Sequence, residues 1–353
     1  MPKSVEPPDQ LLDLQTSNSP ESQEPLSPWH EGERAMHERL GLAERMERAG
    51  RHSIRAFISD QHRAFFAQLP FLLVGSVDDL GWPWVSLLSG PPGFACSPHP
   101  SRLDIAALPV AGDPLSAALK PGASLGSLGI ELPTRRRNRM NGRVIAVNDG
   151  GFSLAVDQSF GNCPQYIHRR AYATLEPVGA PGIEAFTTLD PAARALIQQA
   201  DTFFVASSAG GVGATPNHGV DVSHRGGLAG VLKFAADGAI IVPDYRGNRF
   251  FNTLGNLAIN RRGGIAVHRF RARRSAATGG RDTYRLGWAR GRGRGGCRAH
   301  LAPRTFPWPL AARTTAPAVR GGLGRVLLEA RLHILDEPAR GAPRDMSARK
   351  HQI

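Results

Sequence analysis

The chain has 353 residues, 41% of them apolar, which is enough for two domains of ordinary size with buried cores. Forty glycines and 28 prolines are typical of short strands joined by many turns. Three widely spaced cysteines argue against a disulfide framework or a structural zinc site. Without a secretory signal or an apolar run of about 20 residues, the sequence predicts a cytoplasmic protein with no membrane helix.

The net charge is distributed unevenly along the chain. Residues 268–353 hold 19 lysines and arginines and 5 acidic residues, a net charge of +14. The remaining 24 basic and 25 acidic residues leave residues 1–267 nearly neutral. The basic tail could bind nucleic acid, but it has few aromatic residues and no recognition motif. We therefore expect no nucleic-acid partner for the body of the protein.

The first half of the chain predicts helices followed by strands. Residues 1–30 are rich in Pro, Ser, Glu and Gln and are expected to be disordered. A first domain over 31–180 is expected to begin with helices over 31–50 and 59–68, the second N-capped by Ser59. Its other expected elements are strands at 71–77, 82–88, 123–132, 143–147 and 152–156, a solvated turn at 135–137, and a loop and helix over 160–177.

A second domain over 181–267 repeats this order of elements. The expected elements are a helix over 191–200, strands over 203–207, 221–223, 231–234 and 239–242, a helix over 250–259 and a strand over 264–267. The repetition indicates two copies of one β-rich unit and an α+β fold class.

Three glycine-rich polar segments lie at expected strand ends. They run from Phe160 to Ile167, from Gly219 to Gly227 and from Pro243 to Asn256. Glycine lets backbone N–H groups approach a ligand closely, and an arginine forms charge-assisted hydrogen bonds worth roughly 1.5–3 kcal/mol each. This combination of residues favours a phosphate group as the ligand.

The same segments carry a family resemblance. The chain resembles flavin-nucleotide-binding proteins related to pyridoxamine-5'-phosphate oxidase. The residues that carry this resemblance are Asp221 to Gly227 and Gly247 to Asn252, together with Phe160 to Ile167 and Asn138 to Val144 from the first half. The resemblance covers about residues 35–267. It implies two FMN-binding split β-barrels with flanking helices, the second incomplete, and a flavin at an interface between barrels of one chain or of a homodimer.

The resemblance also implies which residues bind the cofactor. The candidates carried over by position are Ser223, His224 and Arg225 on the strand that reaches the flavin, Asn248 and Arg249 at the phosphate, and Asn162 and Gln165 from the first half. The single terminal phosphate and the lack of a dinucleotide fingerprint favour FMN over FAD. No catalytic side chain and no metal ligand is implied, because the flavin itself carries out redox chemistry.

Simpler interpretations of these residues stay open. Arg225 and Arg249 could be ordinary surface cations, His224 could cap a strand end, and Cys163 could be a buried, inert thiol. For the whole protein, the alternatives are an FMN-dependent oxidoreductase acting on a small molecule, a flavin-binding module without catalysis, and a nucleic-acid-binding protein that uses its basic tail.

The composition changes abruptly after Val267 to Arg, Gly, Ala and Pro without periodicity. Reading degenerate codons from the second base of Val267 permits a string that begins Phe-Ile-Asp-Phe-Glu and is similar to the next two strands of the resembled family. We therefore expect residues 268–353 to be read in a shifted frame, with residues 268–330 poorly ordered, weakly packed on the second barrel and unable to supply its missing strands.

Overall fold

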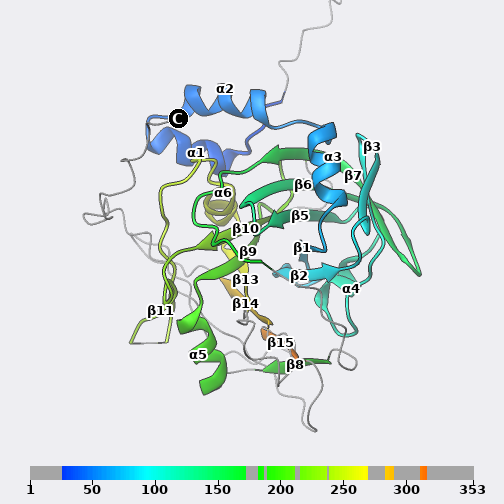
Figure 1. The fold of residues 1–353 in the computed structure, drawn as a ribbon. Helices are drawn as coiled ribbons and strands as arrows, with labels where there is room; N and C mark the ends of the chain where they lie inside the picture. Colours follow the sequence, from blue (N-terminus) through cyan, green and yellow to red (C-terminus); the bar gives the residue numbers. More distant parts are fainter. Residues whose placement is uncertain are drawn as a thin grey trace, which may run out of the picture.

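The computed structural model describes residues 26–171, 182–186, 189–210, 215–236, 238–268, 283–289 and 311–315. The fold is β-rich with few helices, as predicted, and all the strand pairs described are antiparallel (Figure 1). No helix among the described residues is both long enough and apolar enough to span a bilayer. The predicted disordered segment 1–30 falls mostly outside the described residues.

The first half of the chain forms a seven-stranded sheet of order β2-β1-β5-β6-β7-β4-β3. Its strands are β1 (Phe71–Val77), β2 (Pro83–Ser89), β3 (Ala95–His99), β4 (Arg102–Ile105), β5 (Ser124–Glu131), β6 (Arg136–Asn148) and β7 (Gly151–Gly161). The predicted hairpin is confirmed, with Val74 opposite Ser86 in its register. The helices are α1 (Glu31–Arg39), α2 (Ala43–Ser53), α3 (Asp60–Ala67) and α4 (Pro114–Ala118).

The second half forms a six-stranded sheet of order β10-β9-β13-β14-β15-β8. Its strands are β8 (Gly182–Phe186), β9 (Thr202–Ser208), β10 (Val220–Gly226), β13 (Arg262–His268), β14 (Thr283–Ala289) and β15 (Ala311–Thr315). A separate two-stranded sheet joins β11 (Lys233–Phe234) to β12 (Ile240–Ile241). The helices are α5 (Pro191–Gln199) and α6 (Asn252–Ile259).

The two sheets pack against each other through apolar side chains. Leu73, Leu128 and Ile130 of the first sheet share one buried cluster with Phe204 and Val222 of the second. Glycines let the backbones approach in this layer, because a Cβ atom on Gly126 would overlap the carbonyl of Val220. The interface between the sheets is therefore a core of its own, and polar groups within it need partners there.

Helices α1 and α2 cover α6 at one end of the molecule (Figure 1). Gly32 of α1 lies so close to Gly255 of α6 that a Cβ atom on either would collide with the other helix. Trp29, which precedes α1, is 1% exposed and packs edge-on against Phe250 at 4.9 Å between ring centroids. The N-terminal helices are thus fixed to the loop that leads into α6.

Three expectations for local structure are wrong. The helix expected over 31–50 is broken, because Gly41 adopts φ +63° and its N–H and that of Leu42 bond to the carbonyls of Glu38 and His37, which ends α1. The turn expected at 135–137 lies at 132–135 and ends with Arg135, at φ +62°, because Arg136 already belongs to β6. No helix forms over 162–171, and the rest of the expected helix lies outside the described residues.

The expectation of no strand after Val267 is also wrong. Strand β14 pairs with β13 along its whole length, from Arg262 opposite Ala289 to His268 opposite Thr283, and β15 pairs with β14. The short run Thr283-Tyr284-Arg285-Leu286 has the β-branched and aromatic content that strands favour, and pairing itself needs only backbone groups. The reading frame of the gene is a separate question and stays a prediction.

Candidate functional site

The loop that leads into α6 is held in a constrained conformation. Arg249 and Phe251 both have left-handed backbone angles, with φ +62° and +58°, an arrangement that is costly for residues with side chains. Asn248 Oδ1 accepts a hydrogen bond from the N–H of Phe250 at 3.2 Å, and Nε2 of His37 lies 3.0 Å from the carbonyl oxygen of Arg249. With Phe250 buried beneath it, this loop turns Asn248 and Arg249 toward the surface.

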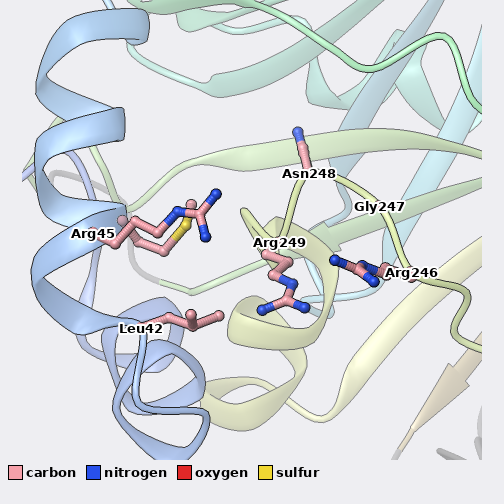
Figure 2. A pocket seen from close by; sticks show the side chains of 7 residues that line it. Leu42, Arg45, Arg246, Gly247, Asn248 and Arg249 are labelled. Carbon is pink, nitrogen blue, oxygen red and sulfur yellow. The ribbon is translucent and has the colours of Figure 1, made fainter. Parts of the chain in front are cut away.

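Asn248 and Arg249 line a pocket of about 240 Å³ between this loop and α2. The lining residues are Leu42, Arg45, Met46, Arg246, Gly247, Asn248 and Arg249. Figure 2 shows Arg45 extending from α2 across the pocket, while Arg246 and Arg249 come from the facing loop. Two segments some 200 positions apart in the sequence therefore supply three guanidinium groups to one pocket.

Among the described residues, no carboxylate neutralises the charges in this pocket. Within the part of the chain that the structure describes, neither Arg45, Arg246 nor Arg249 forms an ion pair with a carboxylate. By contrast Arg48, one turn further along α2, is paired with Glu44 at 3.8 Å. Three like charges that converge without a counter-charge create a positive potential, which an anion would relieve by accepting their N–H groups.

A second polar group of residues lies buried between the two sheets. Arg139 on β6 is 4% exposed and its guanidinium donates to Asp221 Oδ1 at 3.2 Å, to Asn252 Oδ1 at 2.9 Å and to the hydroxyl of Ser223. Asp221 also accepts from Asn141 at 2.7 Å. Because each charge has several partners, this network joins β6, β10 and α6 without an exposed ion.

The network continues into α1 through two further side chains. Asn252 donates to Glu33, and Nε2 of His30 lies 2.8 Å from Asn256 Oδ1. Since the N–H of Gly32 donates to Nδ1 of His30, the proton of this neutral imidazole belongs on Nε2. Burial lowers the pKa of His30, and burial followed by the negative charge of Asp221 raises the pKa of Glu33 well above 4.5.

His224 is buried against a cation rather than exposed to a ligand. Its side chain is 4% exposed, and Arg137 donates to its Nδ1 and to its carbonyl oxygen, both at 3.2 Å. Burial, together with the charges of Arg137 and Arg225, holds the pKa of His224 well below 6.5, so the ring is neutral. Burial and the charges of Arg139 and Arg225 lower the pKa of Arg137 to about 9, and Arg137 stays charged at neutral pH.

The structure separates the seven candidate residues into different environments. Asn248 and Arg249 lie together in the pocket, whereas the hydroxyl of Ser223 is already bonded to Arg139 and Thr253. Arg225 is paired with Asp244 at 2.7 Å. Asn162 is half-buried, with its Nδ2 atom unpartnered among the described residues, and Gln165 is exposed. The described residues contain no cluster of side chains that could hold a metal ion.

Four arginines of these sites, Arg45, Arg137, Arg139 and Arg246, were not predicted from the sequence as functional residues. Arg246 belongs to a motif that was singled out, and Arg139 lies within the segment from Asn138 to Val144, so both had a local signal. Arg137 was expected in a solvated turn, and Arg45 lies on a helix far from any motif. Arg45 lines the pocket because α2 packs against the 246–249 loop, a contact that the sequence does not reveal.

Comparison with known proteins adds little to this geometry. No protein-family model and no curated protein matches the chain. A solved structure of a HupZ variant from Group A Streptococcus is 13% identical and aligns with 30% of this chain and 98% of its own, at a TM-score of 0.24. The Bacillus subtilis inhibitor of motility MotI/DgrA is 8% identical over 70% of this chain and 86% of its own, at a TM-score of 0.19. Scores this low do not establish a shared fold.

Proposed function

We propose that the chain binds FMN, with the phosphate in the pocket lined by Arg45, Arg246, Asn248 and Arg249. The observation that carries this proposal is the convergence of three guanidinium groups that have no carboxylate partner among the described residues. A phosphate dianion would accept several of their N–H groups at once, and Asn248 could add a neutral donor.

The size of the pocket limits how much of the ligand it can hold. Pockets that enclose a whole drug-sized molecule usually measure about 300–1,000 Å³, and this one measures about 240 Å³. The pocket therefore suits the charged end of the ligand, with the ring system outside it. One pocket for one terminal phosphate favours FMN over FAD, in which a pyrophosphate lies between two large groups.

The arrangement of the sheets supports the same class of protein. Each half of the chain contributes one antiparallel sheet, and the two sheets pack face to face within one chain. We interpret them as two split barrels of the pyridoxamine-5'-phosphate-oxidase-like type, over residues 31–180 and 181–267 with the strands that follow. A bound flavin would supply the redox chemistry of an oxidoreductase acting on a small molecule, while the chain binds and orients it.

Two arginine variants with a matched control test the phosphate site. Arg249→Ala and Arg45→Ala each remove one charge-assisted donor, worth roughly 1.5–3 kcal/mol, so FMN affinity is expected to fall by about 10- to 150-fold. Arg48→Ala removes an arginine from the same helix that is paired with Glu44 and lies outside the pocket lining. Quenching of flavin fluorescence measures all three affinities. Equal, small effects of the three substitutions on FMN affinity would contradict the proposal that this pocket binds the phosphate.

A further inference from the structure

Two exposed tyrosines stack on each other beside the arginine pocket. Tyr166 and Tyr245 are 41% and 42% exposed, and their ring centroids lie 5.2 Å apart with an interplanar angle of 27°. They are two of only four tyrosines in a chain that is poor in aromatic residues. Exposed aromatic rings held in a fixed stack present a flat apolar face to solvent, which is how proteins bind the faces of planar rings.

The backbone around this pair holds it rigidly. Tyr166 has a left-handed backbone angle, φ +64°, and its carbonyl lies where the Cβ atom of any side chain at Gly226 would stand. A Cβ atom on Gly227 would lie 3.2 Å from the ring of Tyr245. The tyrosines therefore lie against a stretch of backbone without side chains; a side chain at Gly226 would collide with the backbone of Tyr166, and one at Gly227 would press on the ring of Tyr245.

A hydrogen bond connects the tyrosine pair to the pocket. The hydroxyl of Tyr166 donates to the carbonyl oxygen of Arg246 at 2.9 Å, and the side chain of Arg246 lines the pocket. Burial, followed by the nearby Cys163, Tyr245 and Asp244, raises the pKa of Tyr166, so its hydroxyl stays a donor at neutral pH. Asp244, the acidic residue next to Tyr245, forms an ion pair with Arg225 at 2.7 Å, which offsets part of its repulsion of an anionic ligand.

We propose that Tyr166 and Tyr245 form a platform on which the planar ring system of the ligand stacks while its phosphate occupies the arginine pocket. This inference rests on the proposed function and adds the second half of the site. The pocket alone is too small for a ring system, and the platform adjoins it through one residue, Arg246. The site as a whole would bind a phosphorylated heteroaromatic compound more tightly than a sugar phosphate or an inorganic anion, which would use the arginine pocket alone.

The test compares a ligand that has a ring with one that lacks it. Affinities for FMN are measured by flavin fluorescence, and affinities for ribose 5-phosphate by nuclear magnetic resonance titration, in the full chain. Tyr245→Ala is expected to weaken FMN binding by roughly 5- to 150-fold and to leave ribose 5-phosphate binding within about twofold, because only the stacking contact is lost. Tyr245→Phe should keep the affinity for FMN. Phe57→Ala, which removes an exposed ring elsewhere, should change neither affinity.

Each contrary result has a distinct meaning. If Tyr245→Ala binds FMN like the unmodified chain while Arg249→Ala does not, the platform is overturned and the phosphate pocket stands. If Tyr245→Ala loses both ligands equally, the residue only holds the loop, and the platform is again overturned. If the unmodified chain binds ribose 5-phosphate as tightly as FMN, the ring makes no contact. Failure of the unmodified chain to bind FMN overturns both the platform and the proposed function.

Discussion

Replacing Arg139 by methionine tests the buried network between the sheets. Arg139→Met keeps most of the apolar length of the side chain but removes three hydrogen bonds, to Asp221, Asn252 and Ser223. Asp221 is 7% exposed and would then be a buried carboxylate whose remaining side-chain donors, among the described residues, are the amides of Asn141 and Asn256. Removing one partner of a buried ion pair costs about 3–5 kcal/mol, which is a large part of the roughly 5–15 kcal/mol that holds a domain folded.

Urea unfolding followed by circular dichroism gives this free energy directly. The control is Arg143→Met on the same strand, because Arg143 pairs with Asp157 at 2.7 Å while its side chain is 42% exposed. Because the Asp157 side chain is only 12% exposed, the control should lose more than the roughly 0.2–1 kcal/mol typical of a fully exposed pair but less than the roughly 3–5 kcal/mol expected for Arg139→Met. If the two variants lose the same free energy of unfolding to within about 0.5 kcal/mol, the network holds the sheets together no better than a surface pair and the reasoning is refuted.

The remaining predictions concern pH and the reading frame. Because the pKa of His224 is held well below 6.5, the unfolded chain takes up a proton below about pH 6.5 that the folded chain does not, and stability must fall as pH falls. Urea unfolding of His224→Asn between about pH 7 and pH 5 should show a free energy of unfolding that falls less steeply with pH, by up to about 1.4 kcal/mol per pH unit, and an unchanged slope would contradict the burial of a neutral His224. A chain read from the second base of codon 267 should bind FMN more tightly in a fluorescence titration, and unchanged affinity would count against the frame hypothesis.

Local sequence signals were sufficient for the elements whose ends are marked by specific residues. Ser59 caps α3 as predicted, accepting the N–H of His62, and the hairpin of β1 and β2 follows its turn residues. A single glycine within a helical pattern is often tolerated, so the pattern around Gly41 predicts one continuous helix, whereas its left-handed backbone ends α1. The sequence does not predict β3 because Pro98 and Pro100 interrupt the segment, and the alternation of β4, from Arg102 to Ile105, covers only four residues.

The site could be predicted only in part, because its residues meet through packing. A run of arginines at 135–137 has the composition of a solvated turn, yet Arg137 lies on β6 and bonds to His224 of the other sheet. Neighbouring side chains on a strand point to opposite faces of the sheet. His224 therefore lies on one face of β10, and Ser223 and Arg225 lie on the other, so the three residues cannot all reach the same ligand. The loop residues Asn248 and Arg249 were predictable from their motif, but Arg45 is brought to them by α2.

The most direct test of the proposed function compares FMN with riboflavin, which differs from it only by the phosphate. Equilibrium binding of both to the full chain is measured by flavin fluorescence at one salt concentration. If two or more charge-assisted hydrogen bonds hold the phosphate in the arginine pocket, FMN should bind roughly 100-fold more tightly than riboflavin. Equal affinities for the two compounds, or no binding of FMN, would contradict the proposal that this pocket binds the phosphate of a flavin nucleotide.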